Sequence, residues 1–199
     1  MGLRMFVAIT PPEDVREHLA DFLAPRVGMP WIDEAQWHVT LAFFESVPDH
    51  RIDDLVETLS RSAGRRRPCR LTLTGAGAFP HVDRAVVLWL GLDVDGIPAS
   101  APGAPETEVH RVAVNARAAG TAIGALPDGK RFVPHLTLAR LKRPIEATKW
   151  LRVLDTYRSP RWHLDEIDLV ASYLGEGPGR RPRYETAATI PLGHPEVQA

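Results

Sequence analysis

Short apolar runs and segments of helical periodicity alternate along the first part of the chain. Runs rich in aromatic and β-branched residues at 4–10, 36–44 and 69–75 predict strands, because such residues fit a half-buried pleated surface. Apolar residues three or four positions apart at 15–23 and 52–59 predict two helices. The first part of the chain therefore reads β-α-β-α-β.

The second part repeats that order of elements and adds one strand. Pro, Ala, Gly and Ser dominate residues 96–105, a composition typical of a mobile loop. Gly, Arg and Pro mark a hairpin at 175–183. We predict strands at 85–92, 132–141, 162–174 and 184–190, and helices at 106–122 and 144–154.

One four-residue pattern occurs in both parts of the chain. The strings HVTL at 38–41 and HLTL at 135–138 begin 97 residues apart, each within a predicted strand. That spacing is too long for a solenoid or propeller repeat. The sequence therefore predicts a single domain over residues 1–199, with duplicated halves of roughly 1–80 and 81–199 that fold as two facing lobes.

The repeated pattern carries the candidate chemistry. Successive side chains of a strand point to opposite faces, so each motif has its histidine and threonine on the same face. If the lobes bring the two strands together, one neutral imidazole can accept a proton while a protonated one donates, and the hydroxyls can bind phosphate oxygens. The candidate acid–base pair is His38 and His135, and the candidate phosphate ligands are Thr40 and Thr137.

Two further residues are candidates for substrate binding. Arg140 can stabilise charge on a phosphate, but strict alternation places it on the strand face opposite His135. It reaches the cleft only if the strand twists or carries a bulge. Phe79, in a turn flanked by Gly and Pro, is a candidate for stacking on a base, whereas Trp89 in an apolar strand is predicted to belong to the core.

Composition excludes a disordered chain and a generally basic nucleic-acid binder. Of 199 residues, 44% are apolar and 25% charged, as in ordinary globular proteins. The formal net charge is -1, so a nucleic acid would be held by a local cluster. Arginine clusters at 65–70 and 180–183 fit such a contact and fit solvated loops equally well.

No metal-binding or disulfide pattern occurs in the sequence. The lone cysteine, Cys69, cannot form an internal disulfide, and no Cys/His spacing resembles a zinc site. We therefore expect no cofactor, no metal and a reducing compartment. The first apolar run is too short for a signal peptide, and no run reaches the ~18 apolar residues of a membrane helix, which predicts a cytoplasmic protein.

On these motifs the chain resembles the RNA 2′,3′-cyclic phosphodiesterase family, also called LigT-like or 2′-5′ RNA ligase, within the two-histidine phosphoesterase superfamily. The paired histidine and threonine motifs at this spacing carry the resemblance, which covers nearly the whole chain. Other matching stretches are LRMFVAITPP, WHVTLAFFESV, GAGAFP, VVLWLGL, FVPHLTLARLK and LVASYLGEG with Tyr184.

The resemblance implies a mixed α/β (α+β) bilobal fold of pseudo-two-fold symmetry, with two antiparallel sheets around a central cleft and helices on the outside. It implies that water opens a 2′,3′-cyclic phosphate at an RNA or nucleotide terminus to a 2′-phosphate, without a metal. Similar proteins also join or reverse 2′-5′ linkages in vitro. By resemblance His135 is the general base and His38 the general acid, and Thr40, Thr137 and Arg140 hold the phosphate.

One departure from the family pattern keeps alternatives open. Similar proteins usually carry a basic residue after the first motif, whereas this chain has Ala42 and then Phe43, which predicts a loss of charge facing the nucleic acid. A module that binds nucleotide phosphates without turnover, and a phosphodiesterase for another cyclic nucleotide, are the alternatives. We expect an RNA terminus or nucleotide as the partner, no membrane, and a monomer.

Overall fold

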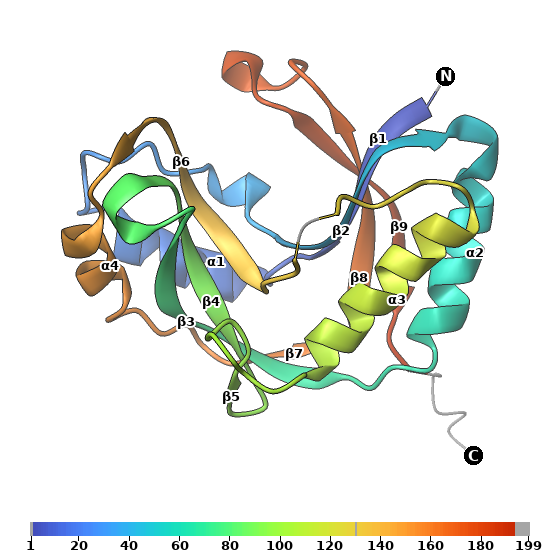
Figure 1. Ribbon diagram of the computed structural model, residues 1–199, viewed down its shortest axis with the longest axis horizontal. Helices are drawn as coiled ribbons and strands as arrows, with labels where there is room; N and C mark the ends of the chain where they lie inside the picture. The colour runs from blue at the N-terminus through green and yellow to red at the C-terminus, as the bar shows by residue number, and fades with distance from the viewer. Residues whose placement is uncertain (1, 130, 194–199) are drawn as a thin grey trace.

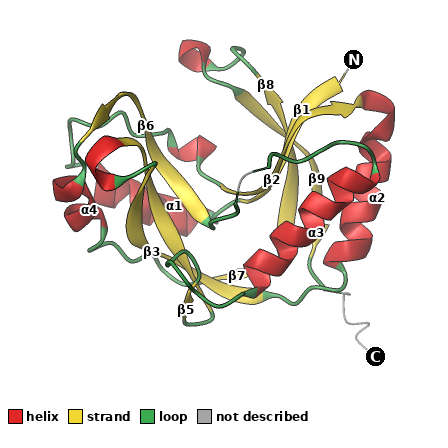
Figure 2. Ribbon diagram, viewed as in Figure 1, coloured by secondary structure: helices red, strands yellow, loops and turns green. Residues whose placement is uncertain are grey.

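The computed structural model describes residues 2–129 and 131–193 (Figure 1). Strands and helices follow the predicted order (Figure 2). The strands are β1 (Gly2–Ile9), β2 (Val39–Pro48), β3 (Cys69–Phe79), β4 (Ala85–Val94), β5 (Ile97–Pro98), β6 (His135–Ile145), β7 (Trp162–Leu164), β8 (Glu166–Tyr173) and β9 (Arg183–Pro191). The helices are α1 (Glu13–Leu23), α2 (Ile52–Ala63), α3 (Glu108–Ala122) and α4 (Thr148–Leu154).

The strands form two antiparallel lobes joined at the middle of one hydrogen-bonded path, β7-β3-β4-β6-β2-β1-β8-β9. We call β1, β2, β8 and β9 the first lobe, and β3, β4, β6 and β7 the second lobe. The lobes meet where β2 pairs with β6, at Val39 and Leu136. The expected bilobal, mixed α/β fold with antiparallel sheets is confirmed, and the two motif strands lie at its centre.

Each lobe contains strands from both parts of the chain. The predicted strand at 162–174 is in fact two strands, because the chain crosses between the lobes at Asp165: β7 pairs with β3, and β8 pairs with β1. The lobes therefore do not coincide with the halves 1–80 and 81–199. A duplication of these halves stays a prediction.

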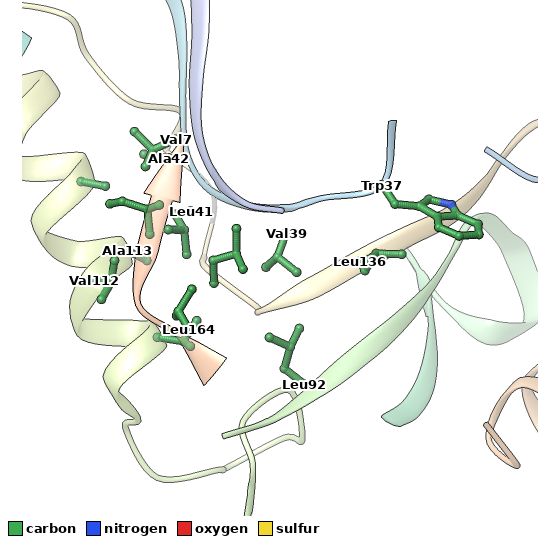
Figure 3. Packing of buried hydrophobic residues seen from close by; sticks show 14 of the residues in the cluster. Val7, Trp37, Val39, Leu41, Ala42, Leu92, Val112, Ala113, Leu136 and Leu164 are labelled. Carbon is green, nitrogen blue, oxygen red and sulfur yellow. The ribbon is translucent and has the colours of Figure 1, made fainter. Parts of the chain in front are cut away.

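A continuous apolar core runs beneath both lobes and passes under their junction. Val39 and Leu136 are each 0% exposed, and Figure 3 shows them between the Leu41 side and the Trp37 side of this core. Helix α2 packs beside α3 on the outer face of the first lobe, while α1 and α4 lie against the second lobe (Figure 1). Because the side chains at this junction are packed in the core, the two motif strands keep a fixed position relative to each other.

Two predicted boundaries differ from the structure. The helix expected at 144–154 begins only at Thr148, because Ile145 still pairs with Ala85 in the sheet. The expected mobile loop at 96–105 contains β5, and the Ser100 hydroxyl accepts a hydrogen bond from the Leu92 amide at 2.8 Å. Mobility of this loop stays a prediction.

None of the helices in the described part of the chain is both long and apolar enough to span a membrane.

Candidate active site

The register of the central strands brings both motifs together. Val39 of β2 pairs with Leu136 of β6 in antiparallel fashion, with both side chains in the core. The residues on either side of this pair point to the opposite face. The pocket on that face contains all four motif side chains, His38, Thr40, His135 and Thr137.

Both motif strands carry the same bulge directly after the threonine. Thr40 and Ala42 face consecutive residues of β1, so Leu41 is an extra residue in the pairing. Thr137 and Ala139 likewise face consecutive residues of β4. A bulge of one residue reverses the face on which every later side chain lies. The repeat is therefore one of backbone geometry as well as of sequence.

The second bulge decides where Arg140 lies. Leu138 and Ala139 are both 0% exposed, so the alternation restarts and Arg140 joins the face of His135. The Ile32 amide donates to the Leu138 carbonyl at 2.7 Å, and Trp31 forms a bridge to Ala139. These contacts lie beyond the single pair of β6 with β2, and they hold the bulge. Arg140 consequently lines the pocket, and its role in holding a phosphate stays a prediction.

The first bulge explains the departure at position 42. Ala42 is 1% exposed and faces the core, so this position does not face the cleft and the expected loss of cleft charge does not follow. Phe43 lies on the same face as His38, and the Arg4 guanidinium carbon lies 4.5 Å above the centre of its ring. A positive charge from β1 is therefore present on this side of the cleft.

Both histidines are oriented by the same kind of hydrogen bond. The Nδ1 atom of His38 lies 2.7 Å from the Gln36 carbonyl oxygen, and the Nδ1 atom of His135 lies 2.7 Å from the Val133 carbonyl oxygen. A carbonyl oxygen only accepts, so each Nδ1 must carry the proton. In each neutral ring the Nε2 atom then keeps a lone pair that can accept a proton.

Aromatic rings surround each imidazole. The His38 ring stacks on Phe6 at 4.6 Å between centroids and meets Tyr184 edge-on at 5.5 Å. His135 meets Phe79 edge-on at 5.0 Å and Trp89 at 5.8 Å. Each lobe thus restricts the rotation of its own histidine with aromatic surfaces.

Phe79 and Trp89 differ from expectation in part. Phe79 contacts His135, but it is not one of the side chains that line the pocket. Trp89 is half-buried on the cleft face rather than in the core, because Gly77 on the paired strand leaves room for its ring. A Cβ at Gly77 would lie 1.9 Å from that ring.

Burial lowers the pKa of both histidines. Burial brings the pKa of His38 from 6.5 to about 4, with smaller contributions from the positive charges of Arg140 and His135, and the Gln36 carbonyl opposes the shift. Burial also lowers the pKa of His135, and Arg140 adds to this while the Val133 carbonyl opposes it. Both imidazoles are therefore neutral in the unliganded pocket at pH 7.

The lining of the pocket suits an anion. Its volume is about 380 Å³, and the described residues that line it include two arginines and two histidines but no carboxylate. Burial raises the pKa of the Tyr184 hydroxyl, so it stays a neutral hydrogen-bond donor there. Among residues 2–129 and 131–193, no group of three or more His, Cys, Asp or Glu side chains is placed to hold a metal.

The sequence matches the 2′-5′ RNA ligase superfamily over residues 8–176. The chain belongs to this superfamily. The RNA 2′,3′-cyclic phosphodiesterase of Aeropyrum pernix is 30% identical over 81% of this chain and 88% of its own length. The resemblance noted in the sequence is therefore confirmed.

Solved structures share the fold of this chain. One from Thermus thermophilus has a TM-score of 0.72 and 26% sequence identity, covering 97% of this chain and 100% of that one. E. coli LigT complexed with 3′-AMP has a TM-score of 0.73 and 24% identity, covering 98% and 100% of the two chains, and this likeness supports the fold alone.

This superfamily member also has pocket residues to which the sequence assigned no individual role. Gln36, Arg181 and the wall formed by 30–32 line the pocket beside the motif residues. Tyr184 matched the family pattern without a role attached. No local signal in the sequence singles out Gln36, because the carbonyl that orients His38 belongs to the backbone and any residue at that position would supply it.

Proposed function

We propose that this protein hydrolyses 2′,3′-cyclic phosphate termini of RNA or nucleotides to 2′-phosphates, with His38 and His135 as a metal-independent acid–base pair. Relatives named RNA 2′,3′-cyclic phosphodiesterase support a cyclic phosphodiesterase. The observation that carries the proposal is the matched orientation of the two histidines: each Nδ1 bonds a carbonyl, and both rings lie in one carboxylate-free pocket.

Phosphate binding falls to the hydroxyls and the arginine. Thr40 and Thr137 lie on the same face as the histidines, where their hydroxyls can donate to the non-bridging phosphate oxygens. Arg140 places a fixed positive charge where negative charge builds up as the phosphorus becomes five-coordinate. Hydrogen bonds of this kind stabilise the transition state more than the ground state.

Proton transfer requires the two Nε2 atoms to act in opposite directions. His135 Nε2 accepts a proton from water as the water oxygen bonds to phosphorus, and His38 Nε2 donates a proton to the 3′ oxygen as its bond to phosphorus breaks. The turnover leaves His135 protonated and His38 neutral, so proton exchange with solvent restores the starting state. If a 5′ hydroxyl attacks in place of water, the same steps form a 2′-5′ linkage, which is the reverse of the cleavage of such a linkage.

The bound phosphate has to stabilise the protonated form of His38. Burial keeps the His38 pKa near 4 in the unliganded pocket, so its imidazolium is rare at pH 7. A neighbouring anion stabilises that imidazolium and raises its pKa. The active protonation state therefore forms in the complex with the substrate.

The decisive experiment measures hydrolysis of a nucleoside 2′,3′-cyclic phosphate in excess EDTA and identifies the product isomer. Release of the 2′-phosphate is expected for the wild type. His38→Ala and His135→Ala are each expected to lower kcat by roughly 10²–10⁴-fold, the usual contribution of one acid or base. His50→Ala, on an exposed turn outside the pocket, serves as the matched control.

The outcomes separate the remaining alternatives. Folded protein that binds a nucleotide 2′-phosphate without turnover would point to a binding module. Activity that disappears in EDTA and returns with a divalent cation would contradict a metal-independent reaction. A histidine variant that retains near-wild-type kcat would remove that residue from the acid–base pair.

A substrate with sulfur in place of the 3′ oxygen tests which histidine is the acid. Sulfur is a better leaving group and needs no proton donor, so this substrate is expected to restore much of the activity of His38→Ala. The activity of His135→Ala is expected to stay low, because the attacking water still needs a base. The opposite result would exchange the two roles.

A further inference from the structure

The turn between β8 and β9 brings a loop into the rim of the pocket. This hairpin extends beyond the rest of the sheet (Figure 1). Arg181 and Pro182, directly before β9, line the pocket. The Gly177 amide donates to the Arg181 carbonyl at 2.9 Å, which fixes the backbone of the turn. A Cβ at Gly177 would lie 2.9 Å from that same oxygen, so the turn closes only around glycine.

The arginines of this hairpin have different surroundings. Arg183 forms ion pairs with Glu176 at 2.9 Å and Glu185 at 2.8 Å, so its charge is compensated. Arg181 has no ion-pair partner among the residues that the structure describes, and it lines a pocket without carboxylates. Among these hairpin arginines, Arg181 is the one whose charge is available to a ligand in the pocket.

Gln36 connects this turn with the catalytic histidine. Its backbone carbonyl accepts the hydrogen bond of His38 Nδ1 at 2.7 Å, and its side-chain Nε2 donates to the Pro182 carbonyl at 2.8 Å. One residue thus fixes both the imidazole and the end of the turn next to Arg181. This bridge ties the His38 imidazole to the turn that carries Arg181.

Building on the proposed function, we propose that Arg181 binds a second phosphate, that of the nucleotide preceding the cyclic end, and that Gln36 positions it. In the proposed function, Thr40, Thr137 and Arg140 on the two motif strands hold the reacting phosphate. Arg181 enters from the exposed rim, where the chain of an oligonucleotide would leave the pocket. The preferred substrate is then an oligonucleotide with a 2′,3′-cyclic end rather than a mononucleotide.

The test compares a dinucleotide and a mononucleotide that both end in a 2′,3′-cyclic phosphate. Arg181→Gln is expected to lower the ratio of their kcat/KM values, dinucleotide over mononucleotide, by roughly tenfold or more, as for loss of one charged hydrogen bond. Arg180→Gln, in the same turn but outside the pocket lining, is the matched control and should keep the wild-type ratio.

Each other outcome is decisive. An unchanged ratio in Arg181→Gln overturns the inference. If the ratio is unchanged because kcat/KM falls equally for both substrates, Arg181 contacts the reacting phosphate instead. If the wild type hydrolyses neither substrate, the proposed function fails separately. Binding of the dinucleotide 2′-phosphate then still tests Arg181, because the variant should reduce the slope of log affinity against log salt by about 0.7.

Gln36→Ala tests the positioning role, since it removes the bond to Pro182 and retains the backbone carbonyl that orients His38. The KM for the dinucleotide is expected to rise, and the double variant with Arg181→Gln should show no further loss, because both changes affect one contact. Additive losses, or a fall in kcat alone, would contradict this role for Gln36.

Discussion

Because His38 is buried and neutral, we predict that the protein loses stability as the pH falls below 6.5. Its pKa is about 4 in the folded protein against 6.5 for an ordinary histidine. Between these values the unfolded chain binds a proton that the folded protein excludes, so stability is complete above pH 6.5 and falls as the pH drops toward 4. At about 1.36 kcal/mol per pKa unit, the loss is roughly 3 kcal/mol.

Urea unfolding between pH 4 and 8 measures this loss. His38→Asn removes the titrating group. As the pH falls from 8 to 4, the wild type should therefore lose roughly 3 kcal/mol more unfolding free energy than the variant. His50→Asn, at an exposed position, is the control and should retain the wild-type pH slope.

Two results would refute the reasoning. One is a His38→Asn variant whose stability falls with pH as steeply as that of the wild type. The other is an NMR titration in which the His38 ring of the unliganded protein titrates near its ordinary pKa of ~6.5.

Saturation with a nucleotide 2′-phosphate should raise the His38 pKa, since the anion favours the imidazolium.

Further predictions concern the arginine and the glycine that shape the pocket. Arg140→Gln should raise the pKa of His38 in an NMR titration, because the Arg140 charge lowers it, and should reduce kcat/KM for a cyclic phosphate by roughly 10–100-fold; an unchanged pKa would contradict the assigned electrostatics. Gly77→Ala should lower the urea unfolding free energy by roughly 1–3 kcal/mol, because its methyl group overlaps the Trp89 ring. Gly129→Ala, where a Cβ meets no atom within 4 Å, is the control; equal effects of the two changes would argue against this overlap.

The sequence determined which motif side chains line the cleft, because side-chain alternation along a strand is local. A strand alternates its side chains whatever its partner, so each motif alone places a histidine and a threonine on one face. The repeated motif and the apolar residues between its polar positions indicated both the buried face and the face that lines the pocket. The order of most helices and strands followed from their periodicity for the same reason.

The tertiary structure decided what depends on a partner strand. A bulge is an extra residue relative to a neighbouring chain, so the strings around Leu41 and Leu138 cannot reveal it by themselves. The bulge in β6, held by the contacts of Trp31 and Ile32, turns Arg140 into the pocket. Periodicity alone placed that arginine on the wrong face.

Contacts between distant segments were also beyond the sequence. The crossing at Asp165 sends β7 and β8 to different lobes, and no local pattern distinguishes it from a continuous strand. Three arginines at and beside the β8–β9 turn could not be distinguished in the sequence. The pocket lining and the Gln36 hydrogen bond to Pro182 set Arg181 apart from its neighbours. Side-chain alternation is a property of one strand, whereas register, crossing and pocket lining are properties of at least two segments, which only the folded chain brings together.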